Sequence, residues 1–131
     1  MLVREWMTPE PISVTPSTPL IEAYRILSEY EIRHLPVLRS EHVVGIVTDH
    51  DLGRAVLALA DAGVSDAHTV QDVMTHAVET IGPDDDLTGA AMLMHNGKFS
   101  ALPVVENGKL AGILTINDLL EALISVLTPH R

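Results

Sequence analysis

The stretch GIVTDHDL at residues 45–52 returns almost unchanged as GILTINDL at residues 112–119. In both copies an aspartate follows a threonine by three residues, a spacing typical of the start of a helix. The threonine hydroxyl can accept a hydrogen bond from the third backbone N–H, and a carboxylate suits the positive helix end. The same free N–H groups can also bind anions. These letters alone therefore leave both a capping role and a ligand-binding role open.

Two other motifs repeat at the same distance along the chain. The matching pairs are VREWMT (3–8) with VQDVMT (70–75), and LPVL (35–38) with LPVV (102–105). Every motif is displaced by 67 residues, and no gap is needed between the two copies. Several motifs in one register indicate an internal duplication. We therefore divide the chain into repeat 1, residues 1–66, and repeat 2, residues 67–131.

Each repeat predicts the element order β-α-β-β-α. Residues 12–14 and 79–81 form brief extended segments ahead of a proline. An amphipathic helix follows, then two strands joined by a short turn, then a last helix. Asn107-Gly108, between two apolar runs, is a strong hairpin signal. The predicted class is α+β, with two such repeats packed together by pseudo-two-fold symmetry.

The first helix of each repeat carries signals for where it begins and ends. Thr18 followed by Pro19 predicts an N-cap and a first-turn proline, with Leu20, Ala23, Leu27 and Tyr30 facing inward. In repeat 2, residues 84–86 are all aspartate and predict an acidic first turn. Asn96-Gly97 predicts the end of that helix.

Composition excludes several classes of function. The 131 residues are 47% hydrophobic and 20% charged, with no cysteine and a net charge of −10. A protein with this negative net charge repels nucleic acids and anionic membranes, so neither is expected as a partner. The first residues contain no apolar stretch typical of a signal peptide, and no run is long enough to span a bilayer. We expect a soluble, cytoplasmic protein.

No enzymatic or metal-binding motif is apparent. The sequence has no nucleophile elbow, no P-loop and no carboxylate pair with acid–base spacing. Its seven histidines include no i, i+4 pair, and Asp49-His50-Asp51 projects side chains in different directions. We expect neither catalysis nor a metal site.

Taken together, the MT segment, the LPV strand and the Gly-x-x-Thr-x-x-Asp-Leu motif, each present twice, resemble a tandem pair of cystathionine-β-synthase (CBS) domains, also called a Bateman module. The resemblance implies two clefts between the repeats that bind AMP, ADP, ATP or S-adenosylmethionine, with no other cofactor. It also implies a regulatory role, in which ligand binding changes the shape of the module and signals to an unknown protein partner. It further implies a homodimer formed through the last helices, whose apolar residues cover more than one face.

The resemblance also assigns site residues. Asp51 and Asp118 take the place of the aspartate that accepts both ribose hydroxyls, and Thr48 and Thr115 that of the threonine beside phosphate or ribose. The remaining candidates on the strands and loops are Thr15, Pro16, Arg33, His34, Pro36, Ile46, Ile81, Pro83, Pro103 and Ile113.

Arg33 and His34 have two competing interpretations, phosphate recognition and a solvated turn. Repeat 2 has Ser100 and Ala101 at these positions, with Lys98 out of register. We therefore expect a dominant site for phosphorylated nucleotide at Asp51 and a weaker or differently occupied one at Asp118. The alternative to a nucleotide sensor is a dimerising interaction scaffold with empty clefts.

Overall fold

The computed structural model describes residues 1–59, 62–63 and 67–129. The chain forms two compact units: unit 1 is Met1–Pro11 with Glu79–Arg131, and unit 2 is Ile12–Val78. Each unit therefore takes its MT segment from the other sequence repeat. The covalent repeats 1–66 and 67–131 and the compact units are two different divisions of the chain.

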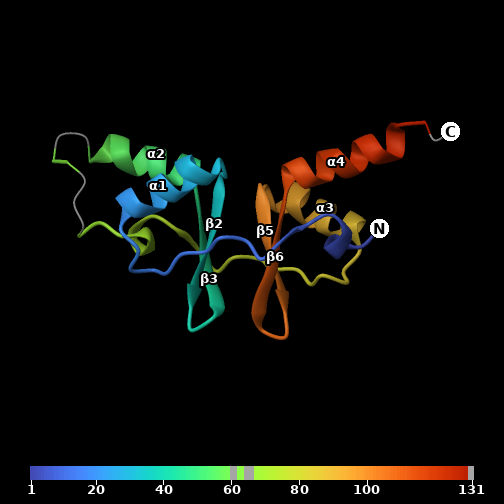
Figure 1. Cartoon of the computed structure of the whole chain (residues 1–131), viewed down its shortest axis with the longest axis horizontal. Coiled ribbons are helices and arrows are strands. Elements are labelled where there is room, and N and C mark those ends of the chain that lie inside the picture. The colour runs from blue at the N-terminus through green and yellow to red at the C-terminus, as the bar shows by residue number, and fades with distance from the viewer. Residues whose placement is uncertain (60–61, 64–66, 130–131) are drawn as a thin grey trace. The chain divides into compact units, whose positions relative to one another are not determined.

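Unit 2 contains one antiparallel sheet with the strand order β2-β3-β4. Its elements are α1 (Leu20–Tyr30), β2 (His34–Arg39), β3 (His42–Thr48), α2 (Asp49–Ala58), the 3-10 turn η2 (Val70–Asp72) and β4 (Thr75–His76). Figure 1 shows β2 and β3 as a long hairpin with α1 and α2 near one end of it. The predicted connector at 61–69 lies partly outside the described residues.

Unit 1 repeats this design with the strand order β1-β6-β5. Its elements are η1 (Val3–Glu5), β1 (Thr8–Pro9), α3 (Leu87–Gly97), β5 (Ala101–Glu106), β6 (Lys109–Thr115) and α4 (Ile116–Leu127).

The predicted element order is confirmed in both units. The short extended segments form single parallel bridges, Val14 to Val37 and Ile81 to Val104, rather than full strands. Each unit buries its own apolar core, built on Leu35 and Val47 in unit 2 and on Leu102 and Leu114 in unit 1. Burial of these side chains is the main stabilising term for each unit.

The MT segments and the repeated glycines fit together physically. A Cβ on Gly45 would lie 2.7 Å from Sδ of Met74 and 2.9 Å from the carbonyl oxygen of Thr75. A Cβ on Gly112 would lie 2.6 Å from Sδ of Met7. Because β4 and β1 pair with the strands at these glycines, only a residue without a side chain allows so close an approach.

The hairpin predicted at Asn107-Gly108 is confirmed. Both residues have positive φ, 54° and 78°, as expected for the two central residues of a type I′ turn. Ser40 and Glu41 hold the same positions in unit 2 with φ of 50° and 69°. Unit 2 therefore makes the same turn with two residues whose Cβ atoms disfavour a positive φ.

Two predictions about helix starts are wrong. Thr18 is not an N-cap, because α1 starts at Leu20 and its capping residue, Pro19, makes no side-chain cap. The Thr18 hydroxyl instead accepts a hydrogen bond from the backbone N–H of Thr15 at 3.1 Å. Residues 84–86 precede α3 and do not form its first turn; Asp85 accepts a hydrogen bond from the N–H of Gly82 at 2.7 Å. In both units these side chains form hydrogen bonds within the loop that precedes the helix, and they do not cap the helix.

The predicted end of α3 is correct. The helix ends at Gly97, and the left-handed residue that follows it is Lys98, with φ of 58°. Glu31 ends α1 in the same conformation. Tyr30, expected on the inward face of α1, is 57% exposed, because it lies in the last turn, beyond the core.

Candidate functional site

Thr48 and Asp51 form a reciprocal capping box where β3 passes into α2. The N–H of Asp51 donates to Oγ1 of Thr48 at 3.1 Å, and the N–H of Thr48 donates to Oδ2 of Asp51 at 3.0 Å. The capping interpretation is thus correct, although the N3 residue is Asp rather than the more common Glu.

Thr115 and Asp118 form the corresponding box where β6 passes into α4. The N–H of Thr115 donates to Oδ2 of Asp118 at 2.8 Å, and the Thr115 hydroxyl donates to the same oxygen at 3.1 Å. The return bond from the N–H of Asp118 to Oγ1 of Thr115 is longer, at 3.4 Å.

Capping occupies only one oxygen of each carboxylate. The side-chain bonds of Asp51 and Asp118 all go to Oδ2, and Oδ1 of neither accepts a hydrogen bond from a described residue. An ionised carboxylate can accept several hydrogen bonds. Capping and ligand binding are therefore compatible in each unit.

The two carboxylates differ in their surroundings. Asp118 is only 9% exposed and is the one buried polar side chain among the described residues, whereas Asp51 is half-buried. Burial raises the pKa of Asp118, the hydrogen bonds from Thr115 oppose this rise, and the charge of Glu121 adds to it. The site in unit 1 is thus drier and more negative than an exposed helix start.

Basic residues flank Asp51 in unit 2. His34 pairs with Thr48 across β2 and β3, and the carbonyl of the exposed Arg33 accepts the N–H of Asp49 at 3.0 Å. Burial lowers the pKa of His34; the carboxylates of Asp49 and Asp51 raise it, and Arg33 lowers it. Arg33 is therefore the permanent cation of this pair, and His34 is mainly neutral at pH 7.

Unit 1 lacks these cations, as expected. Ala101 takes the place of His34 and pairs with Thr115, while Ser100 takes the place of Arg33. The Ser100 carbonyl accepts the N–H of Ile116 at 3.1 Å. The backbone arrangement is thus kept, and only the charge is lost.

The apolar candidates on the strands are cross-strand partners. Pro36 pairs with Ile46 in unit 2, and Pro103 pairs with Ile113 in unit 1. All four are at most 8% exposed. They lie two residue pairs from the capping threonines and support the site as part of the sheet.

Pro16 and Pro83 bond through their backbone carbonyls, whereas Oγ1 of Thr15 also lies 3.2 Å from the hydroxyl oxygens of Ser17 and Thr18. The carbonyl of Pro16 accepts the N–H of Gln71 at 3.0 Å, and that of Pro83 accepts the N–H of Arg4 at 2.8 Å. Thr15 is exposed and follows Val14, whose N–H donates to the carbonyl of Pro36.

Ile81 is buried, and its N–H donates to the carbonyl of Pro103 at 3.1 Å. The bonds from Val14 to Pro36 and from Ile81 to Pro103 join each loop to the strand that carries the proline of the LPV motif. No hydrogen bond between described residues joins Thr15, Pro16, Ile81 or Pro83 directly to Asp51 or Asp118.

A cavity of about 300 Å³ adjoins Asp51. Its lining residues are Asp51, Arg54, Ala55, Ala58 and Val73. Arg54 is not among the site residues predicted from the sequence, although its position three residues after Asp51 places both side chains on one helix face.

Within the described part of the chain, no three metal-ligating side chains of the His, Cys, Asp or Glu type come together. The described helices include none long and apolar enough to cross a membrane.

The model of the CBS domain matches the chain twice, at residues 3–58 and 70–125. The chain belongs to the CBS domain family. The two matches contain both capping boxes, both MT segments and both LPV strands, so the predicted resemblance is confirmed.

Relatives of this CBS domain pair differ widely in length. It is 35% identical to a 17.7 kDa protein of Acidianus ambivalens over 117 residues, 88% of this chain and 68% of that protein. It is also 35% identical to a homoserine O-acetyltransferase of Methanocorpusculum labreanum, over 91% of this chain but 23% of the enzyme. The CBS pair is a minor part of that enzyme and regulatory in kind, so the likeness carries no catalytic residues to this chain.

Solved CBS domain pairs have the same fold. One is the pair of protein MJ0100 in complex with 5′-methylthioadenosine and S-adenosyl-L-methionine, with a TM-score of 0.84 and 27% identity, covering 96% of this chain and 98% of that one. Another is CBSX2 in complex with AMP, with a TM-score of 0.79 and 31% identity, covering 97% and 98%. Both structures hold adenosine compounds.

Proposed function

We propose that this CBS domain pair is a regulatory module that binds adenosine-containing ligands at Asp51 and Asp118 and signals to a protein partner by changing shape. The observation that carries the proposal is that Oδ1 of each aspartate accepts no hydrogen bond from a described residue, while Oδ2 of the same carboxylate is fixed by the cap. A ribose offers two neighbouring hydroxyl donors, and a carboxylate held in one rotamer can accept both without further loss of side-chain entropy.

The candidate ligands are AMP, ADP, ATP and S-adenosylmethionine. The AMP complex of CBSX2 and the S-adenosyl-L-methionine complex of the MJ0100 pair support this class. We assign the module no chemistry of its own, because its candidate sites consist of a carboxylate and a hydroxyl that already cap a helix.

A thermal-shift and denaturation series tests the proposal. A ligand present at about 100 times its dissociation constant should add about 2.7 kcal/mol to the free energy of unfolding. Hydrogen bonds to a charged group contribute about 1.5–3 kcal/mol, so Asp51→Ala should weaken binding about ten- to a hundredfold. Arg33→Ala should weaken AMP or ATP binding and spare adenosine. If no adenosine compound shifts the transition, the sensor proposal is wrong.

A scaffold role is the second candidate, favoured by the surface of α4. Six large apolar side chains on this helix are 47–70% exposed: Ile116, Leu120, Leu123, Ile124, Val126 and Leu127. We propose that this face forms an isologous homodimer contact, with or without ligand. Dimer formation together with no response to any adenosine compound would favour the scaffold over the sensor.

A further inference from the structure

The cavity beside Asp51 is lined along one face of α2. Asp51, Arg54, Ala55 and Ala58 follow one another at intervals of three or four residues, and Val73 lines the cavity from the segment ahead of β4. The side chain of Arg54 is exposed and forms no ion pair with a described residue. The cavity thus offers a carboxylate and an unused cation side by side.

The corresponding positions in unit 1 carry different chemistry. Counting 67 residues on, Glu121 replaces Arg54, and Ala122 replaces Ala55. Glu121 lies close enough to Asp118 for its charge to raise the pKa of that carboxyl. In unit 2 the carboxylates of Asp49 and Asp51 are accompanied by Arg33 and Arg54, whereas in unit 1 Asp118 and Glu121 have no arginine at the corresponding positions. The acidic groups are balanced by arginines in unit 2 and left unbalanced in unit 1.

The space differs as well. Val73 corresponds to Trp6, which packs against the core cluster that contains Ala122. The indole N–H of Trp6 is buried and has no acceptor among the described residues. Ala122 is 5% exposed, whereas Ala55 is half-buried. An indole fills much more volume than an isopropyl group, so unit 1 has less room beside its helix than unit 2.

We infer that Arg54 recognises the phosphate of a phosphorylated adenosine ligand in unit 2, and that Glu121 and Trp6 reserve the site in unit 1 for an adenosine compound without phosphate, such as a nucleoside thioether. The inference rests on the proposed function and adds a ligand class for each site. A guanidinium can donate two parallel hydrogen bonds to phosphate, and it offsets the repulsion expected from a net charge of −10.

The negative charge of Glu121 favours an adenosine compound without phosphate over a phosphorylated one in unit 1. A phosphate near Asp118 and Glu121 would meet two carboxylates with no basic residue at the positions of Arg33, His34 or Arg54. Like charges at short distance repel, and the repulsion is strongest next to the buried carboxylate of Asp118. An uncharged nucleoside thioether avoids this cost and places its apolar part next to the indole of Trp6.

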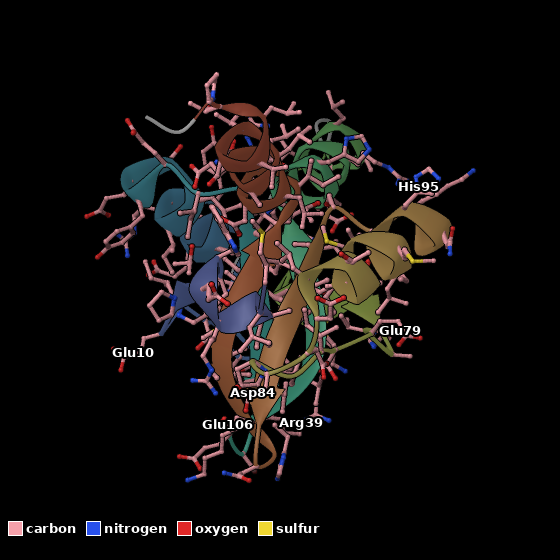
Figure 2. The ribbon with its side chains drawn as sticks, turned by 90° about the vertical axis from the view of Figure 1, so that its right-hand side faces the viewer. Glu10, Arg39, Glu79, Asp84, His95 and Glu106 are labelled. Atoms are coloured by element: carbon pink, nitrogen blue, oxygen red, sulfur yellow. The ribbon has the colours of Figure 1, made fainter. Side chains whose placement is uncertain are left out.

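Titration calorimetry on the full chain, with AMP, adenosine and 5′-methylthioadenosine as probes, tests the assignment. Asp118→Ala isolates the site of unit 2, and Asp51→Ala isolates that of unit 1. In the first background, Arg54→Gln should weaken AMP about tenfold or more and change adenosine less than about twofold. Arg39→Gln removes the same charge at the end of β2 (Figure 2) and should leave AMP nearly unchanged.

In the Asp51→Ala background, 5′-methylthioadenosine should bind more tightly than AMP, and Glu121→Arg should strengthen AMP about tenfold. Equal losses of AMP and adenosine affinity in Arg54→Gln would overturn the inference, as would equal effects of Arg54→Gln and Arg39→Gln. AMP binding to both sites with one affinity would overturn it too, while leaving the proposed function intact. Failure of the parent chain to bind any of the three probes, and equally ADP, ATP or S-adenosylmethionine, would remove the proposed function itself.

Discussion

Oδ2 of Asp118 accepts two hydrogen bonds from Thr115, one from the backbone N–H at 2.8 Å and one from the hydroxyl at 3.1 Å. These bonds hold a carboxylate that is only 9% exposed at the start of α4. Thr115 therefore both caps the helix and compensates a buried charge, since an uncompensated carboxylate in this position would be costly.

Removal of that hydroxyl should be measurable. We expect Thr115→Ala to lower the free energy of unfolding by about 1–2 kcal/mol, because the helix loses its cap and Asp118 loses a donor. Thr115→Ser keeps the hydroxyl and should recover most of the loss. Urea denaturation at constant m-value measures both. An equal loss in the two variants would show that the methyl group matters, and not the hydrogen bonds.

The raised pKa of Asp118 predicts a pH dependence. The folded chain holds this proton more tightly than the unfolded chain, so the contribution of Asp118 to stability falls as the pH rises from its ordinary value of 3.8 through the raised one. Asn cannot titrate. The difference in unfolding free energy, Asp118→Asn minus wild type, should therefore increase between pH 3 and pH 7. A difference that is constant or decreases with pH would contradict the assignment.

The glycine of the repeated motif can be tested against another glycine nearby. Gly45→Ala would bring a methyl group to 2.9 Å from the Thr75 carbonyl, which the sheet holds in place, so we expect a loss of about 1–3 kcal/mol. A Cβ at Gly53, in α2, meets nothing within 4 Å. Gly53→Ala should therefore stabilise the chain by about 0.5–1 kcal/mol. Thermal or urea unfolding compares the two, and the prediction fails if both alanines act in the same direction.

The sequence was enough to predict the duplication, the element order and the capping boxes, because all depend on local patterns. The sequence could not predict that each unit contains the MT segment of the other sequence repeat, since Met7 and Gly112 are more than a hundred residues apart. The predictions of an N-cap at Thr18 and of an acidic first turn at residues 84–86 were wrong because hydroxyls and carboxylates can bond to loop backbone as readily as they cap helices. Arg54 could have been found by extending the helix face from Asp51 by one turn.

The strain in the two hairpin turns can be tested by exchanging the residues at positions 41 and 108. Gly108 and Glu41 occupy the same left-handed position, at φ of 78° and 69°. A residue with a Cβ pays about 1–2 kcal/mol there, less the entropy that glycine gains in the unfolded chain. We expect Glu41→Gly to stabilise the chain by up to about 1 kcal/mol and Gly108→Glu to destabilise it by a similar amount. Matching signs for the two exchanges, measured by urea unfolding, would refute the strain argument.

The last prediction concerns assembly through α4. Ile124 and Leu127 are 63% and 70% exposed, in a helix with no basic residue in its last turn. An apolar face of this size in water favours association, because each square ångström removed from water contributes about 25 cal/mol. We expect light scattering at micromolar concentration to give twice the chain mass of 14.2 kDa. Ile124→Glu should halve that mass, since it would bury a charge at the contact. Met92→Glu, at a residue of α3 that is 59% exposed, is the control and should leave the dimer intact. A wild-type mass of one chain would exclude this contact, and dissociation by both substitutions would mean that α4 is not its specific location.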